Sequence, residues 1–393
     1  MTTAKRQSRG GLLSALALLL AASGACEGSA QAVPASAAAA VARGRPADSA
    51  AIIAEIRAFA GPIPDAATAA RAGSAARRYE TDFVRHDDRQ WAQCGARWDC
   101  INYYDRALIY YVWWQRTGSP KYRIRADQVA LNYRRAYLEP GDFGIAHHWS
   151  MSDGVALHYL ATGDSASLVA VGKVADNFSY LVTADASGYI GNPAKMDNRI
   201  QAYALKALLA AYRLDARSVG IRRYGLPGGY DWPTVLRTAL DKILGTRDAD
   251  GQWRGAKCGP RGRATHPFAI GLLYDALIRY YELFEADPRI PEAIQRSADV
   301  LWREDWLANA NAFKYVGMAC PGEGGPRPAA DLNNMIVNAY GWLYKQTGNP
   351  LYRQQADRIF AGGVNAGAVS NGPKWFNQNY TSSYRYLVWR SDR

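Results

Sequence analysis

The chain has 393 residues, of which 49% are hydrophobic and 12% aromatic, and its formal net charge is +12 at pH 7. This composition supplies a large core and excludes disorder over most of the length. The positive charge suits nucleic acid, anionic membranes or acidic polysaccharides, although an arginine-rich composition alone accounts for it equally well.

The N-terminus has the pattern of an export signal. Lys5, Arg6 and Arg9 precede an apolar run over Leu12–Ala22, which is too short to span a bilayer, and small residues follow. Loss of these three basic residues lowers the formal charge from +12 to +9. We therefore expect a periplasmic or secreted protein and exclude nucleic acid as a partner. The predicted parts are a signal segment over 1–30, a flexible leader over 31–48 and one folded domain over 49–393.

Cys26 leaves the processing site open. Ser23-Gly24-Ala25-Cys26 resembles a bacterial lipobox, with serine in place of the usual leucine three residues before the cysteine. Cleavage there predicts an outer-membrane lipoprotein held by a lipid on Cys26, whereas cleavage after Ala30 predicts an exported protein without a lipid. The membrane is a partner only in the first case.

The other four cysteines are expected to form disulfides. Cys94 and Cys100 are close in sequence, and Cys258 and Cys320 each lie in a Gly/Pro-rich loop. Exported proteins retain disulfides, and the simplest pairing is Cys94–Cys100 with Cys258–Cys320. Metal ligation is the alternative, but no CxxC or histidine-rich spacing accompanies these residues. Nothing indicates a nucleotide, haem or zinc, so no cofactor is expected.

Helix–turn–helix units recur along the chain. Three of them share a Thr-Gly turn followed by an Ala-Asp pair: Thr117-Gly118 with Ala126-Asp127, Thr162-Gly163 with Ala175-Asp176, and Thr347-Gly348 with Ala356-Asp357. A looser copy runs from Asp287-Pro288 to Ala298-Asp299. Such a unit cannot bury its apolar face alone and must stack on its neighbours. The sequence therefore predicts one all-helical array.

Five hairpins, each with an inner and an outer helix, follow from the apolar spacing. Their ranges are Ile101–Arg116 with Lys121–Tyr137, Ser150–Ala161 with Ala166–Leu181, Arg199–Arg213 with Trp232–Leu244, Pro267–Phe284 with Pro291–Trp302, and Leu332–Gln346 with Leu351–Phe360. The chain ends supply a sixth pair, Ala50–Phe59 docked on Tyr380–Arg390, which would close the array into a ring. Three long connections, over 215–231, 246–265 and 305–331, are expected to crowd one rim and to be functional.

The hairpins also carry a family resemblance. His147-His148-Trp149, Leu157-His158-Tyr159 and Thr162-Gly163-Asp164, with Tyr340, Tyr344 and Thr347-Gly348-Asn349-Pro350, resemble the six-hairpin, or (α/α)6-toroid, carbohydrate-active enzymes. The resemblance spans roughly Ala92 to Arg393 and is shared by many glycoside hydrolases and polysaccharide lyases. It implies an all-α toroid with a cleft at the N-terminal ends of the inner helices, where saccharide is bound and cut.

Polar and aromatic residues near these helix starts and in the long connections form the candidate site. Sugar hydroxyls bind planar amides and carboxylates, and sugar rings lie on aromatic side chains. The candidate catalytic residues are Asp105, His148, Asp153, Asp197 and His266. The candidate substrate-binding residues are Asp99, Asn102, Trp149, Asn198, Arg199, Trp253, Asn334, Asn379 and Tyr380.

Helix architecture explains several acidic residues and one histidine equally well. Asp197, Asp331 and His266 stand where N-caps belong, and Asp153 fits a capping box. The run over 86–88, His-Asp-Asp, is expected in a solvated loop. The aspartates that recur at equivalent outer-helix positions are expected to be structural: Asp127, Asp176, Asp299 and Asp357.

Hydrolysis of a poly- or oligosaccharide is the predicted activity. It needs a carboxylic acid that protonates the leaving oxygen and a second carboxylate that activates water or attacks. Asp105, Asp153 and Asp197 come from successive inner helices and could converge on one sugar. No glutamate occupies an inner-helix start, so the acid would be an aspartate with a raised pKa.

β-Elimination on a uronate polymer is the alternative. It needs a base such as histidine or tyrosine, and cationic or amide groups that neutralise the carboxylate. His148, His266 or Tyr380 could serve as the base, with Asn198 and Arg199 as neutralising groups. A non-catalytic saccharide-binding protein is the third interpretation, although such a scaffold would more often show even repeats and short loops. The oligomeric state is left open.

Overall fold

The computed structural model describes residues 49–391 except 101–102, 185–186, 222–225, 228, 256–257, 259–261 and 323. The predicted signal segment, the leader and Cys26 lie outside the described residues. Residues Arg45–Arg393 cluster as one compact unit. Within the described ranges, no helix combines the length and apolar character that crossing a membrane requires.

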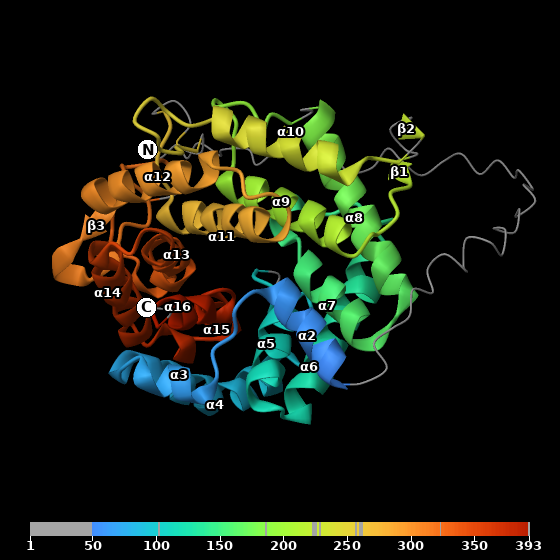
Figure 1. The fold of residues 1–393 in the computed structure, drawn as a ribbon, viewed down its shortest axis with the longest axis horizontal. Coiled ribbons are helices and arrows are strands. Elements are labelled where there is room, and N and C mark those ends of the chain that lie inside the picture. Colours follow the sequence, from blue (N-terminus) through green and yellow to red (C-terminus); the bar gives the residue numbers. More distant parts are fainter. Residues whose placement is uncertain are drawn as a thin grey trace, which may run out of the picture. The chain divides into compact units, whose positions relative to one another are not determined.

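The compact unit is a ring of helical hairpins (Figure 1). The inner helices are α5 (Arg106–Thr117), α7 (Ser152–Thr162), α9 (Asn198–Arg213), α11 (Pro267–Leu283), α13 (Val337–Thr347) and, sharing the last inner position, α15 (Pro373–Tyr380) and α16 (Tyr384–Trp389). The outer helices are α6 (Pro120–Tyr133), α8 (Ser165–Ala184), α10 (Trp232–Gly245), α12 (Arg289–Asp305), α14 (Pro350–Asn365) and α4 (Ser74–Cys94). Each inner helix contacts the next, and α15 contacts α5. The predicted (α/α)6 toroid is confirmed.

The repeated Thr-Gly turn ends three inner helices in the same way. Gly118, Gly163 and Gly348 are left-handed C-caps, with φ of 68°, 71° and 70°. A side chain is strained in this conformation, which explains the glycine. The preceding threonine hydroxyl donates back into the helix, as from Thr117 to the carbonyl of Trp113 at 2.7 Å. The turn is thus a helix stop that lets the outer helix fold back.

The aspartates that recur in the outer helices hold neighbouring elements together. The Tyr111 hydroxyl donates to Asp127 at 2.5 Å, and the Tyr352 hydroxyl donates to Asp299 at 3.1 Å. The other two carboxylates make equivalent contacts, Asp176 with Ser218 and Asp357 with Tyr386. These side chains lie in the packing between helices, away from the cleft described below.

The sixth hairpin is not the one predicted. Helix α2 (Ser49–Ala60) packs mainly on α5 and α7, and the carbonyl of its last residue, Ala60, accepts hydrogen bonds from Tyr384 at 2.8 Å and Arg385 at 2.6 Å of α16. The outer partner is instead α4, where the ring of Tyr79 lies 4.6 Å from that of Tyr380. Ring closure therefore uses a helix that the apolar pattern did not reveal.

The run over 86–88 lies in α4 and not in a loop, which corrects the prediction. Asp87 is fully buried, and its carboxylate pairs with Arg125 at 2.5 Å and Lys121 at 3.0 Å. The neighbouring outer helix α6 thus neutralises the buried charge of Asp87, and this charge breaks the usual apolar spacing of α4.

Short elements complete the chain. They are α3 (Ala66–Arg71), η1 (Arg134–Leu138), η2 (His147–Trp149), β1 (Gly220–Ile221), β2 (Leu226–Pro227), β3 (Trp306–Leu307), η5 (Ala308–Ala310), β4 (Ala312–Phe313), η6 (Ala330–Met335) and η7 (Ala368–Ser370). Strands β1 and β2 pair antiparallel, as do β3 and β4.

Both predicted disulfides are present, Cys94–Cys100 and Cys258–Cys320. The second joins the connection between α10 and α11 to the connection between α12 and α13. In the described part of the chain, no group of three His, Cys, Asp or Glu side chains is placed to hold a metal ion.

Candidate active site

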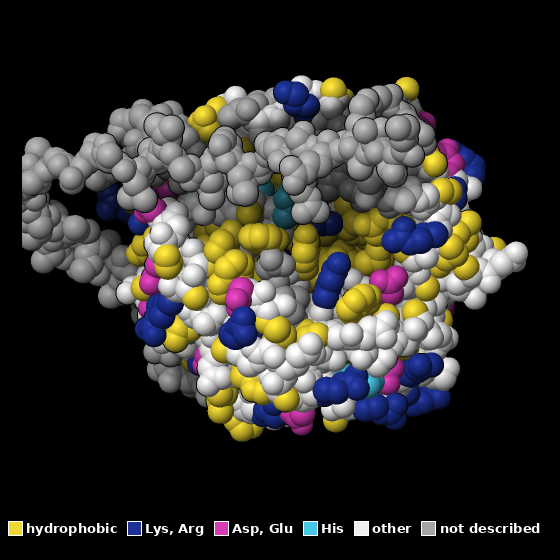
Figure 2. Space-filling model, turned by 180° about the vertical axis from the view of Figure 1, so that it is seen from behind, with side chains coloured by type: hydrophobic (Ala, Val, Ile, Leu, Met, Phe, Trp, Pro, Cys, Tyr) yellow, Lys and Arg dark blue, Asp and Glu magenta, His cyan; other side chains and the backbone are white. Residues whose placement is uncertain are grey.

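A cleft lies where the inner helices begin. It consists of two adjoining hollows of about 320 Å³ and 370 Å³. The hollows share four lining residues, Tyr103, Arg199, Phe268 and Tyr315. Figure 2 shows a hollowed face on which hydrophobic, histidine and Lys or Arg side chains lie together, the combination that lines this cleft.

The first hollow contains a histidine–aspartate pair. His148, from η2, points its Nε2 at Asp197 Oδ2 over 3.2 Å. Asp197 is the N-cap of α9 and accepts a hydrogen bond from the backbone N–H of Arg199 at 3.0 Å, so its carboxylate is held in place. Trp149 and His266 line the same hollow. The pair is arranged for proton transfer, because the carboxylate orients the imidazole.

Arg199 stands in the wall between the two hollows. Its guanidinium lies 5.3 Å from the ring of Tyr103 and 5.3 Å from the ring of Phe268. Its Nε is buried and makes no hydrogen bond. A guanidinium held between two aromatic faces keeps its charge and its donors for a ligand.

The second hollow is lined by residues from the loop before α5, from α9 and α11, from the connection between α12 and α13, and from α15. Asp331, in η6, accepts a hydrogen bond from Gln378 at 3.0 Å. Arg327 and Lys374 face the same hollow, as does Trp375. The sequence reasoning did not single out these last three residues. Their signal was weak, because Arg327 lies in a connection and Lys374 and Trp375 begin a short helix, α15, that no Thr-Gly turn marks.

Asp105 and Asp153 lie together beneath the cleft. Asp105 caps α5 and accepts backbone hydrogen bonds from Leu108 at 3.1 Å and Gly154 at 2.6 Å. With Asp153, Ser150 and Lys206 it lines a small cavity of about 20 Å³. A space of this size holds about one water and no sugar ring. Burial, and secondarily the charge of Asp153, raise the pKa of Asp105 to about 7.

Asp153 belongs to a buried ionic cluster on the inner helices. Its carboxylate pairs with Arg279 at 2.8 Å, and Asp275 pairs with Lys206 at 2.7 Å and with Arg385 at 3.3 Å. Burial alone would raise the pKa of Asp275, but the three surrounding cations hold it well below its usual range. The ion pair with Arg279 therefore explains the buried position of Asp153. This arrangement does not bring its carboxylate into direct contact with a saccharide.

Three predicted binding residues point into the protein. The indole of Trp253 is fully buried and donates to the carbonyl of Ile243 at 3.0 Å. Asn198 is buried and donates to Gln201 at 3.0 Å, although it lies between two residues of the cleft region. The hydroxyl of Tyr380 donates to a backbone carbonyl of α4 at 2.9 Å. The structure gives these side chains no access to the cleft, which corrects the prediction.

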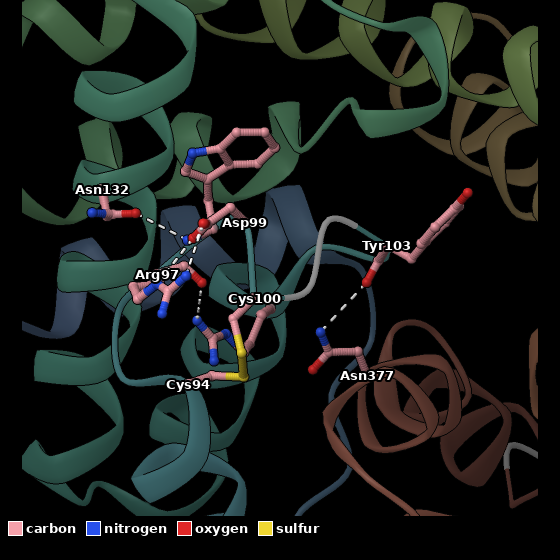
Figure 3. Close-up of a disulfide and its surroundings, with 9 residues drawn as sticks. Cys94, Arg97, Asp99, Cys100, Tyr103, Asn132 and Asn377 are labelled. Carbon is pink, nitrogen blue, oxygen red and sulfur yellow. Dashed lines mark hydrogen bonds and ion pairs between the residues drawn. A yellow bond between two sulfur atoms is a disulfide. The ribbon is translucent and has the colours of Figure 1, made fainter.

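The remaining predicted binding residues also lie elsewhere. Asn334 and Asn379 are buried and bond each other at 2.5 Å. Asp99 is exposed beside the Cys94–Cys100 disulfide and pairs with Arg97 at 2.9 Å (Figure 3). Asn102 lies outside the described residues. Of the predicted residues, the cleft thus combines the set His148, Trp149, Asp197, Arg199 and His266.

Tyr103 of the cleft follows Cys100 of the first disulfide by three residues. Its carbonyl accepts a hydrogen bond from Asn377 of α15 at 3.4 Å, which ties the loop before α5 to the last inner helix (Figure 3). The closing contact of the ring therefore also positions an aromatic side chain of the cleft.

No known protein family and no curated protein matches this chain in sequence. Its fold is similar to solved structures of unsaturated glucuronyl hydrolases. The one from Bacillus sp. GL1, described as responsible for the degradation of glycosaminoglycan, has a TM-score of 0.54 and 14% identity, over 80% of this chain and 95% of that one. The one from Streptococcus agalactiae has a TM-score of 0.51 and 10% identity, over 84% and 94%. A variant enzyme solved with dGlcA-Glc-Rha-Glc has a TM-score of 0.53 and 13% identity, over 80% and 95%.

Proposed function

We propose that this chain, whose fold is an (α/α)6 toroid, is a carbohydrate-active enzyme that hydrolyses an oligosaccharide containing a uronate. The observation that carries the proposal is the cleft itself, in which Arg199 stands between aromatic rings next to the His148–Asp197 pair. The similar folds of glucuronyl hydrolases support the same substrate class.

Arg199 is assigned to the uronate carboxylate. Arg199 lines both hollows of the cleft and forms no ion pair with a carboxylate among the described residues, whereas most other buried cations there are paired. A planar guanidinium binds a carboxylate through two parallel hydrogen bonds. Tyr103 and Phe268 keep the guanidinium in one orientation and offer apolar surface to the sugar ring.

His148 is assigned to proton transfer. In hydrolysis the leaving oxygen gains one proton as its bond to carbon breaks, and the attacking water loses one. His148, oriented by Asp197, supplies the first proton, and Asp331 is the carboxylate of the adjoining hollow that could accept the second. Asp105 and Asp153 are assigned to support of the cleft floor, because the cavity between them is too small for a sugar.

Elimination remains the second candidate, and one observation favours it. A histidine that is oriented by a carboxylate and lines the same hollow as an arginine is what abstraction of a proton beside a uronate carboxyl requires. Elimination creates an unsaturated uronyl group and raises the ultraviolet absorbance. Hydrolysis that releases an unsaturated uronyl residue lowers that absorbance.

Three substrates separate these activities: a neutral oligosaccharide, a saturated uronate oligosaccharide, and one that ends in an unsaturated uronyl residue. Loss of absorbance on the third substrate means hydrolysis of that residue, and gain on the second means elimination. New reducing ends without either change mean hydrolysis of an ordinary glycosidic bond. Absence of products from all three would overturn the enzymatic proposal.

The matched variants are His148→Ala and His86→Ala. His148→Ala is expected to lower kcat by about 10²- to 10⁴-fold, the usual contribution of a general acid or base. His86 lies on the outer helix α4, bonded to Arg89 at 2.9 Å, so its removal should leave the rate unchanged. Equal activities of the two variants would remove His148 from the proposed chemistry.

We also propose that the protein is exported, which the two disulfides support. Mass spectrometry of the mature chain from fractionated cells tests this. A lipid-modified N-terminal Cys26 supports the lipoprotein, and a start after Ala30 supports the form without a lipid. An unprocessed N-terminus in the cytoplasm would contradict export.

A further inference from the structure

Three cations surround the second hollow, and each lies over an aromatic ring. Lys374 Nζ is 5.2 Å from the ring of Tyr103, and Arg327 Cζ is 4.2 Å from the ring of Tyr315. The guanidinium of Arg199 also lies over the ring of Tyr103. All of these residues line the hollow. The cations are therefore held at the cavity wall and are not scattered over the surface.

The contacts form one continuous series. Phe268 joins its two halves, because its ring stacks on Tyr315 at 5.6 Å and receives the guanidinium of Arg199 at 5.3 Å. The order along the wall is Lys374, Tyr103, Arg199, Phe268, Tyr315 and Arg327. Ring faces attract cations without cancelling their charge. The series thus places three charges at fixed positions around one space.

These charges have no close ion-pair partner among the described residues. None of Arg199, Arg327 and Lys374 forms an ion pair with a carboxylate there, although the charge of Asp197 acts on Arg199 at longer range. The hollow is lined by three cations against one carboxylate, Asp331, which already accepts a hydrogen bond from Gln378. The formal excess is two positive charges, which one uronate cannot neutralise.

We propose that the cleft binds a saccharide with two anionic groups on adjacent sugars, one at Arg199 and the other between Arg327 and Lys374. The inference rests on the proposed saccharide function and narrows its substrate class. Arg327 lies in the connection before η6 and Lys374 in the first turn of α15, so they approach the second group from two sides. A carboxylate or a sulfate ester supplies the required chemistry.

Calorimetric binding of matched oligosaccharides tests the inference independently of turnover. The saccharides share one uronate and differ at the neighbouring sugar, which is neutral, carboxylated or sulfated. The wild type is expected to bind the doubly charged ligands about tenfold more tightly than the singly charged one, because a charge-assisted contact is added. A preference for one doubly charged ligand identifies the anion. Equal affinity for all three would overturn the inference.

The variants Arg327→Gln and Lys374→Gln should each abolish most of that preference and leave the singly charged ligand unaffected. Both side chains are exposed, so the substitutions leave the core intact. Arg353→Gln is the matched control, since Arg353 also lies over a tyrosine ring, at 5.8 Å from Tyr344, but on the outer helix α14. Loss of preference in the control, or its retention in both test variants, would refute the inference.

The cleavage and binding assays distinguish failure of the enzymatic proposal from failure of the two-anion inference. If the charge preference is found but no saccharide is cleaved, the enzymatic function is wrong and the binding inference stands. If cleavage occurs at the same kcat/KM on all matched substrates, the enzymatic function stands and the two-anion inference is wrong.

Discussion

Removal of the Cys258–Cys320 disulfide is expected to destabilise the protein about twice as much as removal of Cys94–Cys100. The cross-links join residues separated by 62 and 6 positions. In the chain-entropy model, a cross-link restricts the unfolded chain by an amount that grows with the logarithm of the loop length. That relation gives a loss of about 4 kcal/mol for the long loop and about 2 kcal/mol for the short one.

The longer cross-link also supports the cleft. It joins the connection before α11 to the segment that carries Tyr315, where the N–H of Gly317 donates to the carbonyl of Thr265 at 3.0 Å. Its loss is therefore expected to weaken saccharide binding as well as stability. The short cross-link encloses a surface loop, and its loss should affect binding less.

The assay compares two double variants, Cys258→Ala with Cys320→Ala and Cys94→Ala with Cys100→Ala. Urea unfolding followed by tryptophan fluorescence gives the free energy of unfolding by linear extrapolation. Alanine avoids burying a hydroxyl in place of the fully buried Cys258. A loss for the short-loop variant that equals or exceeds that of the long-loop variant would refute the loop-entropy argument.

Two further predictions concern the inner helices. Asp105→Asn should gain stability relative to the wild type as pH rises from about 4 to about 7, because folded Asp105 keeps its proton up to a pKa of about 7 while the unfolded chain releases it near 3.8. The wild type loses stability over that pH window. Thermal unfolding of both proteins at a series of pH values measures this, and a difference in stability between them that stays constant with pH would contradict the prediction. Gly271→Ala should cost about 1–3 kcal/mol, since its Cβ would lie 2.5 Å from the carbonyl oxygen of Met335. Gly245→Ala, whose Cβ meets no atom within 4 Å, should instead gain up to about 1 kcal/mol, and the same unfolding curves measure both.

The sequence alone determined the repeat and its turns, and it indicated the cross-links without fixing their connectivity. A glycine at a left-handed helix end and a threonine that bonds back into the helix are local requirements, so Thr117-Gly118 could be read without the fold. The simplest pairing of the four cysteines followed from their positions in two separate regions. Helix α4 was not predicted because its inward-facing charge, Asp87, is neutralised by helix α6, which only the tertiary fold brings near.

The tertiary structure decided which helix-start residues reach the cleft. Consecutive side chains at a helix start point about 100° apart. Asp197 therefore turns to His148, Asn198 to Gln201 inside the protein, and Arg199 to the cleft. Spacing along the chain predicts that such residues lie at one rim, but the direction of each depends on the neighbours that the closed ring provides. For the same reason Arg327, from a connection, and Lys374, from α15, face one hollow only once the ring is closed.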